Sequence, residues 1–253
     1  MIKGTFHLAT VRPNIDVMGN QAYSANDVLF DWHAFEIPRG GCRLTSLQIT
    51  MPGTNGADAN VHDIDLLFGK SINGVAPTSL GAANSAVTLI KMTSSKNNIM
   101  AYKFLDADKM SNNGDFIGYN VWSDTAGINS QNAVNIVLEG DPNYTGTTVG
   151  YQTIWIAAVA QGAFDFGTGI LNDGAKTSGL TLDVSEDVDA DDVFDVGDQI
   201  MSIASNGDSP VIHGSITSLT ADAITIDELG GSIGDDHEII FRAPITFNLG
   251  FEY

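Results

Sequence analysis

A run of acidic side chains between Asp183 and Asp198 has the residue types and spacing that come closest to a chemical site. Four of its aspartates match ligand positions 1, 3, 5 and 12 of a helix–loop–helix calcium loop: Asp187, Asp189, Asp191 and Asp198. The run departs from that pattern because Asp192 replaces the glycine at position 6 and position 12 lacks the longer, bidentate glutamate. No amphipathic helix flanks it, and Phe194 and Val196 alternate like strand residues. A solvated acidic loop beside a strand is therefore the favoured interpretation, with calcium as the alternative.

Two arginines are the candidate contact residues for a partner. Arg39 and Arg43 bracket the Gly40-Gly41 turn, and 9 of the chain's 11 basic residues lie outside residues 168–243. A guanidinium group presents a planar fork of donors that matches a carboxylate. We expect this pair to contact carboxylates on a partner's surface, with surface solubility alone as the alternative role.

The remaining reactive side chains do not form a catalytic pattern. Cys42 is the single cysteine, no Cys-His motif accompanies it, and a buried, inert thiol is expected. The histidines have no metal-ligand spacing: His7, His33, His62, His213 and His237. The sequence also has no nucleophile elbow, phosphate loop or dinucleotide fingerprint. The prediction is no catalytic residue, no cofactor and no enzymatic activity, with a β-sandwich hydrolase using paired carboxylates as an alternative.

Three tryptophans could stack on sugars, as in a lectin: Trp32, Trp122 and Trp155. Trp155 lies in the run Thr153–Val159, which is apolar at nearly every position. Such a run predicts a central strand covered on both faces, so we expect Trp155 in the core.

Negative charge is concentrated in one segment. Residues Thr168–Ala243 contain 16 acidic and 2 basic residues, a net charge of −14 out of −20 for the whole chain. This change in composition predicts an acidic domain, 168–243, inserted into a host domain of residues 1–167 and 244–253. A surface this negative repels phosphates, so nucleic-acid and membrane partners are not expected.

Alternation with a period of two dominates the host and predicts an all-β fold. The clearest case is the C-terminus, where apolar residues alternate with polar ones from Ile245 to Phe251. Short strands and turns in the insert predict a small β-barrel. Removing it would join Ala163-Phe164 to Pro244-Ile245, so we expect the insertion at a hairpin tip between the last two host strands. The segment Phe104–Met110 is the one helical candidate.

The lone cysteine suits folding in a reducing cytosol. The N-terminus lacks a signal-peptide pattern, and no apolar run reaches the roughly 18 residues that span a bilayer.

The order of the host motifs resembles a known family. The resemblance rests on five segments in chain order. They are Tyr23–Asp27 before a strand, Gly40-Gly41 leading into Arg43–Ile49, the strand Ile64–Phe68, the strand Tyr151–Ile156 and the terminal alternating strand. Over residues 1 to about 165 and 244–253, this order resembles the jelly-roll head decoration, or cement, proteins of tailed-bacteriophage virions. The acidic insert departs from that pattern.

The resemblance implies a jelly-roll-like antiparallel β-sandwich with an inserted barrel and a mechanical role. Such a protein would be made in the host cytoplasm, bind the major capsid protein on the outside of the head as a homotrimer, and stabilise the shell, with the acidic barrel pointing outward. The alternative is a carbohydrate- or receptor-binding module of a tail fibre or another lectin-like sandwich.

Overall fold

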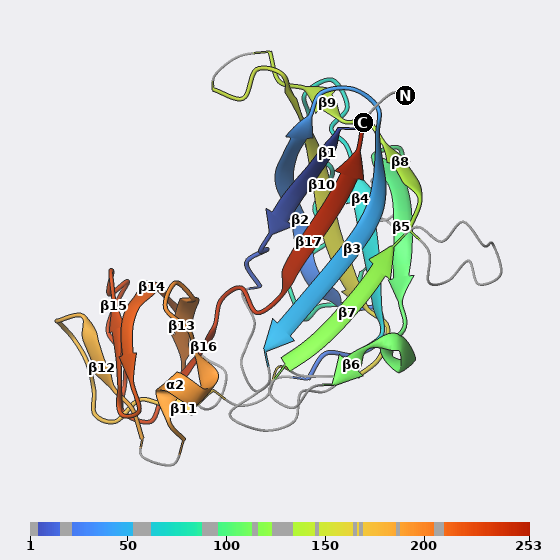
Figure 1. Ribbon diagram of the computed structural model, residues 1–253. Helices are drawn as coiled ribbons and strands as arrows, with labels where there is room; N and C mark the ends of the chain where they lie inside the picture. Colours follow the sequence, from blue (N-terminus) through green and yellow to red (C-terminus); the bar gives the residue numbers. More distant parts are fainter. Residues whose placement is uncertain are drawn as a thin grey trace.

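The computed structural model describes residues 5–15, 22–52, 62–87, 96–112, 116–122, 134–144, 147–163, 166, 169–185, 188–204 and 210–253. Two antiparallel sheets pack face to face, and a third sheet stands beside one end of them (Figure 1). The predicted all-β class is therefore confirmed.

The first sheet of the sandwich has the order β1-β17-β3-β7-β6, with β8 paired to β3. Its strands are β1 (Phe6–Val11), β3 (Cys42–Pro52), β6 (Ser111–Asn112), β7 (Phe116–Trp122), β8 (Ile136–Leu138) and β17 (Thr246–Glu252). The second sheet has the order β2-β10-β4-β5, with β9 paired to β10. Its strands are β2 (Val28–Pro38), β4 (Ile64–Gly69), β5 (Ile99–Leu105), β9 (Asp141–Pro142) and β10 (Tyr151–Ala160).

This strand order is that of a jelly roll. When the long strands β1, β2, β3, β4, β5, β7, β10 and β17 are numbered 1 to 8 along the chain, the sheets read 1-8-3-6 and 2-7-4-5. Successive strands thus alternate between sheets, apart from the 4-5 hairpin, as two interleaved Greek keys require. The predicted jelly-roll-like sandwich is the observed architecture.

The core between the sheets follows the sequence alternation. On β17 and just before it, Ile245, Phe247, Leu249 and Phe251 are all fully buried, while the residues between them are half-buried. They pack with β10 residues such as Ile154 and Ile156 in one large cluster. A strand with one buried face was predicted here and is confirmed.

A second, smaller cluster covers the outer face of β2, β4 and β10. Its buried members are Val28, Leu67, Leu80, Ala157 and Val159. Residues 78–87 run along β2 and close this cluster, with backbone hydrogen bonds of 2.9 Å joining Val28 to Ser85 and to Asn84. The prediction that β10 is covered on both faces is therefore confirmed for its second half.

Register shifts in the pairing of β10 with β2 mark a bulge near Phe30. It explains why Phe30 and Phe35, which differ in alternation phase, both reach the core.

The third sheet has its own core and closes into a barrel. Its order is β11-β16-β13-β14-β15-β12, and the bridge between Asn172 and Val184 joins the two ends. Its strands are β11 (Ile170–Leu171), β12 (Thr181–Asp183), β13 (Gln199–Ile203), β14 (Val211–Thr220), β15 (Ala223–Ile226) and β16 (Glu238–Phe241). None of its core residues belongs to the host core. We call residues 169–243 of this structure the barrel and the sandwich the host.

The connection that holds the barrel differs from the expected hairpin. The flanking strands β10 and β17 lie in different sheets, so the barrel is inserted into a crossing from one sheet to the other. The hairpin-tip prediction was wrong because alternation identifies a strand but not the sheet it joins.

The short helices also differ from expectation. The helical candidate is strand β5 up to Leu105, followed by a single 3-10 turn, η1 (Ala107–Lys109). Within the acidic run, α2 (Ala190–Val193) replaces the predicted strand character, with Phe194 as its C-terminal cap. Aspartates favour a helix N-terminus, which accounts for this outcome. Within the described residues, no helix is long and apolar enough to cross a membrane.

Candidate functional site

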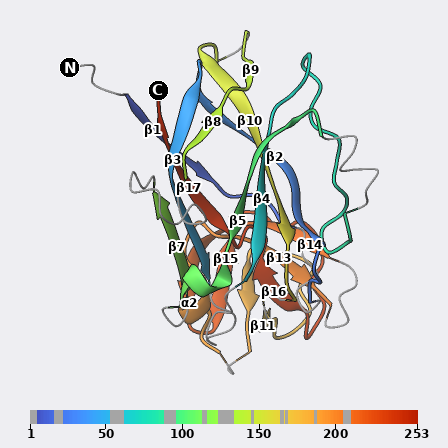
Figure 2. The same cartoon turned by 90° about the vertical axis from the view of Figure 1, so that its right-hand side faces the viewer.

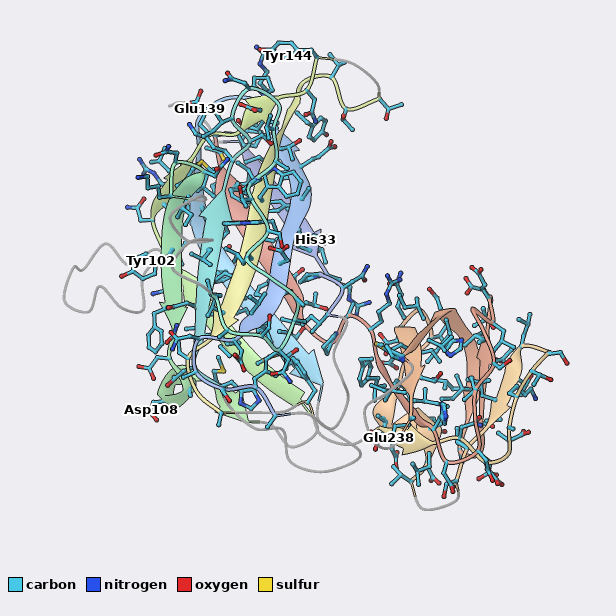
Figure 3. The ribbon with its side chains drawn as sticks, turned by 180° about the vertical axis from the view of Figure 1, so that it is seen from behind. His33, Tyr102, Asp108, Glu139, Tyr144 and Glu238 are labelled. Carbon is cyan, nitrogen blue, oxygen red and sulfur yellow. The ribbon has the colours of Figure 1, made fainter. Side chains whose placement is uncertain are left out.

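Arg39 lies at the end of the host farthest from the barrel. It follows β2 at a turn where Gly40 has a φ of 117°, a conformation that glycine adopts without strain. Its guanidinium carbon is 5.3 Å from the centroid of the Tyr144 ring, which is 72% exposed. Figure 3 shows Tyr144 at this end and Glu238 in the barrel at the other. Arginine stacked on tyrosine is a common composition at the centre of protein interfaces.

A buried glutamine fixes this turn. The side-chain amide of Gln152 donates to the carbonyl oxygens of Pro38 and Gly40, and its oxygen accepts from the Gly140 N–H at 2.9 Å. Arg39 N–H also donates to the Gly150 carbonyl at 2.8 Å. The position of Arg39 is thus set by a rigid scaffold, which lowers the entropy lost on binding. The sequence offered no signal for Gln152, because its three partners come from two distant segments.

Arg43 is exposed on β3 and does not share the Arg39 site. Its cross-strand neighbours are Glu252 on β17 and Val137 on β8, whose side chain is 66% exposed. The structure therefore places the two predicted contact arginines on one end of the host but on different features, the turn and the outer face of the first sheet.

A cleft of about 360 Å³ separates the host from the barrel. It is lined by Arg12, Thr50, Met51, Asp192, Val193, Asp195, Asp198, Phe241, Ala243, Pro244 and Thr246. Arg12 crosses it, because its Nε donates to Thr246 Oγ1 at 2.8 Å and its Nη2 lies 3.5 Å from Asp198 Oδ1. Among the described residues this is the one ion pair within 4.0 Å. The Ile15 N–H also donates to the Arg242 carbonyl at 2.8 Å, a second tie between host and barrel.

Asp198 is the more buried partner of that pair. Its side chain is 14% exposed, whereas that of Arg12 is 50% exposed. Burial raises the pKa of Asp198, although the Asp195 N–H, which donates to Oδ2 at 2.9 Å, and Arg12 act in the opposite direction. A half-exposed pair of this kind orients the barrel more than it stabilises the fold.

The calcium candidates are not brought together as far as the structure describes them. Asp189 is the N-cap of α2, Asp191 lies in its first turn, and Asp198 turns toward Arg12; Asp187 lies outside the described residues. Across the described residues, no three histidine, cysteine or acidic side chains are grouped to hold a metal ion.

Ser202 and His213 form a buried pair that resembles a catalytic dyad. Ser202 Oγ and His213 Nε2 are 2.8 Å apart, and the Gly230 N–H donates to His213 Nδ1 at 3.3 Å. Since Nδ1 accepts, the ring proton is on Nε2 and is donated to the serine. A general base would need the reverse arrangement. The pair is therefore built for packing in the barrel and not for nucleophilic catalysis.

Acidification is expected to destabilise the barrel through His213. Burial lowers the pKa of His213 in the folded protein. The unfolded chain then binds a proton that the folded chain rejects, so stability is lost as pH falls through the ordinary histidine value of about 6.5. Below that pH, the free energy of unfolding of the wild type should fall, relative to that of His213→Gln, by up to about 1.4 kcal/mol per pH unit. Denaturant unfolding from pH 8 to 5 measures this, and a constant difference between the two proteins contradicts it.

Cys42 is buried, and its thiol lies 3.3 Å from the Leu138 carbonyl oxygen. Burial raises its pKa to about 11, so almost no thiolate exists at neutral pH. The expected buried, inert thiol is confirmed.

The indole N–H groups of two tryptophans donate hydrogen bonds within the chain. Trp32 Nε1 donates to the Thr78 carbonyl at 3.1 Å, and Trp155 Nε1 donates to Ser71 Oγ at 3.0 Å. Both rings are half-buried on the outer face of the second sheet, so the prediction that Trp155 lies in the core was wrong. Gly69 faces Trp155 on the neighbouring strand, and an added Cβ there would lie 2.9 Å from the Trp32 ring. The side chain of Trp122 is outside the described residues.

Comparisons with known proteins give no family. No family model and no curated protein matches this chain. Among solved structures, a chain of infectious bursal disease virus, Gx strain, matches with 8% identity and a TM-score of 0.19, covering 99% of this chain and 40% of that chain. A TM-score this low carries no argument about fold or function.

Proposed function

We propose that this protein is a structural component of a tailed-bacteriophage virion, a capsid decoration protein that binds the outside of the head and stabilises the shell. The observation that carries the proposal is the polarity of the molecule. A rigid jelly roll presents Arg39 stacked on Tyr144 at one end, and the barrel, in the segment with a net charge of −14, stands at the other. Such a molecule fits docking by the host end with the barrel in solvent.

The partner in this proposal is the major capsid protein, and the protein binds as a homotrimer. The paired strands of the two sheets keep their conformation on binding, so they lose little conformational entropy. Several copies contacting neighbouring subunits raise avidity even when each contact is weak. Burial of Ser202, His213 and Cys42 keeps these three side chains away from a substrate.

Charge reversal at the host end should weaken shell binding. We expect Arg39→Glu together with Arg43→Glu to raise the Kd for purified capsids roughly tenfold at low salt, about 1.4 kcal/mol, and less at high salt. The matched control removes negative charges from the barrel with Asp189→Asn, Asp191→Asn and Asp192→Asn and should leave the Kd unchanged. Co-sedimentation with expanded shells gives both values.

The opposite ranking, in which the barrel variant loses or gains binding and the arginine variant does not, would place the barrel at the interface. Absence of wild-type binding to any shell, combined with saturable binding to a glycan array, would favour the carbohydrate-binding alternative.

A further inference from the structure

Strand β1 leaves one edge of the first sheet open. Its one strand partner among the described residues is β17. Thr5 and Tyr253 exchange both backbone hydrogen bonds, at 3.2 and 3.0 Å. Because antiparallel partners alternate in hydrogen bonding, the N–H and C=O groups of Phe6, Leu8 and Thr10 point away from β17.

The side chains at this edge are apolar and exposed. Phe6 is 72% and Leu8 65% exposed, and β1 contains no Asp, Glu, Lys or Arg. The other long strands that end host sheets are protected, β2 by Asp31, Glu36 and Pro38 and β5 by Lys103. Proteins blunt open edges with charges or proline unless the edge is used for pairing. Strand β1 has neither kind of protection along its length.

We propose that β1 pairs with β1 of a second copy of this chain, antiparallel, about a twofold axis at Leu8. Leu8 then faces Leu8 of the second copy, and Phe6 faces its Thr10. This register gives every outward N–H and C=O group of these three residues a partner, and it places the exposed Leu8 side chains in contact. The inference goes beyond the proposed function and does not depend on it.

The distribution of charge favours the antiparallel orientation of the two copies. Two molecules of net charge −20 repel one another, and a strand without Asp or Glu is where they can approach. The barrel stands at the end where β1 terminates and Arg12 follows (Figure 1). An antiparallel pair puts the two acidic barrels at opposite ends, whereas a parallel pair would bring them together. Since a twofold contact cannot close a ring of three, in the proposed homotrimer it would join copies of neighbouring trimers.

The edge is visible from the side in Figure 2, where β1 lies at the margin of the sheet.

A cysteine at the twofold position tests the pairing directly. Directly opposed residues of a hydrogen-bonded pair have Cα atoms about 5.5 Å apart, within the range of a disulfide. We expect Leu8→Cys in the full chain, oxidised with diamide, to become a covalent dimer on a denaturing gel. Wild type is the background control, because Cys42 is buried with a raised thiol pKa.

Two further variants test the register. Phe6→Cys and Thr10→Cys should each remain monomeric on the gel, since identical positions would lie four residues apart, roughly 13 Å along the strand. Mixed together, the two should form a dimer. Equal cross-linking of all three single variants, or none by Leu8→Cys and the mixture while each variant unfolds like the wild type, would overturn the proposal. Shell binding by the reduced variants is measured separately, so failure of this contact and failure of the decoration role are told apart.

Discussion

Replacing Phe247 with alanine is expected to lower the free energy of unfolding by about 3–5 kcal/mol, a large part of the stability of a typical domain. Phe247 is fully buried near the start of β17, and its ring centroid lies 5.7 Å from that of Phe30 on the opposite sheet. The substitution removes this contact between the sheets and leaves a cavity that a closely packed core cannot fill. Denaturant unfolding followed by tryptophan fluorescence measures the loss.

Tyr102→Ala is the matched control, because Tyr102 is 68% exposed on edge strand β5. The free energy of unfolding of this variant should stay within about 0.5 kcal/mol of the wild-type value. Comparable losses for the two aromatic residues would contradict the position of Phe247 between the sheets.

The sequence was informative wherever one face of a strand is buried. The alternation from Ile245 to Phe251 predicted β17 correctly, because hydrophobic side chains two residues apart must share a face. It was uninformative about which sheet each strand joins. The insertion between β10 and β17 could not be recognised as a crossing, since that depends on pairing with β3 and β4. The sequence was also uninformative about how much of the outer face of β10 is covered. Residues 70–87 cover only part of that face, so Trp155 is half-buried there.

The features of the candidate site come from contacts distant in sequence. Arg12 and Asp198 are 186 residues apart, and no local pattern links them. Arg39 was identified from its place beside a glycine turn, but its stacking on Tyr144 depends on the loop before β10. In the acidic run, spacing alone suggested calcium ligands, whereas the structure places Asp189, Asp191 and Asp192 at the start of α2, where negative charge is favourable.

Deleting residues 168–243 should leave a host that unfolds cooperatively and still binds shells. The host and barrel cores share no residue, and the described ties between the modules are the Arg12–Asp198 pair and the bond from Ile15 to Arg242. The deletion changes the net charge from −20 to −6. Because the ends lie in different sheets, a flexible Gly-Ser linker must replace the barrel, and a tight turn would not reach across.

A second deletion, of residues 168–241, separates the two ties. It keeps Arg242 and hence a partner for the fully buried Ile15 N–H, while both deletions lose the half-exposed ion pair. An unsatisfied buried N–H costs about 1–3 kcal/mol and an exposed pair about 0–1 kcal/mol. The shorter deletion should therefore be the more stable by roughly 1–3 kcal/mol in denaturant unfolding. Loss of a cooperative transition in both would show that the barrel and the host fold as one unit, and equal stability of the two would show that the Ile15 bond contributes nothing.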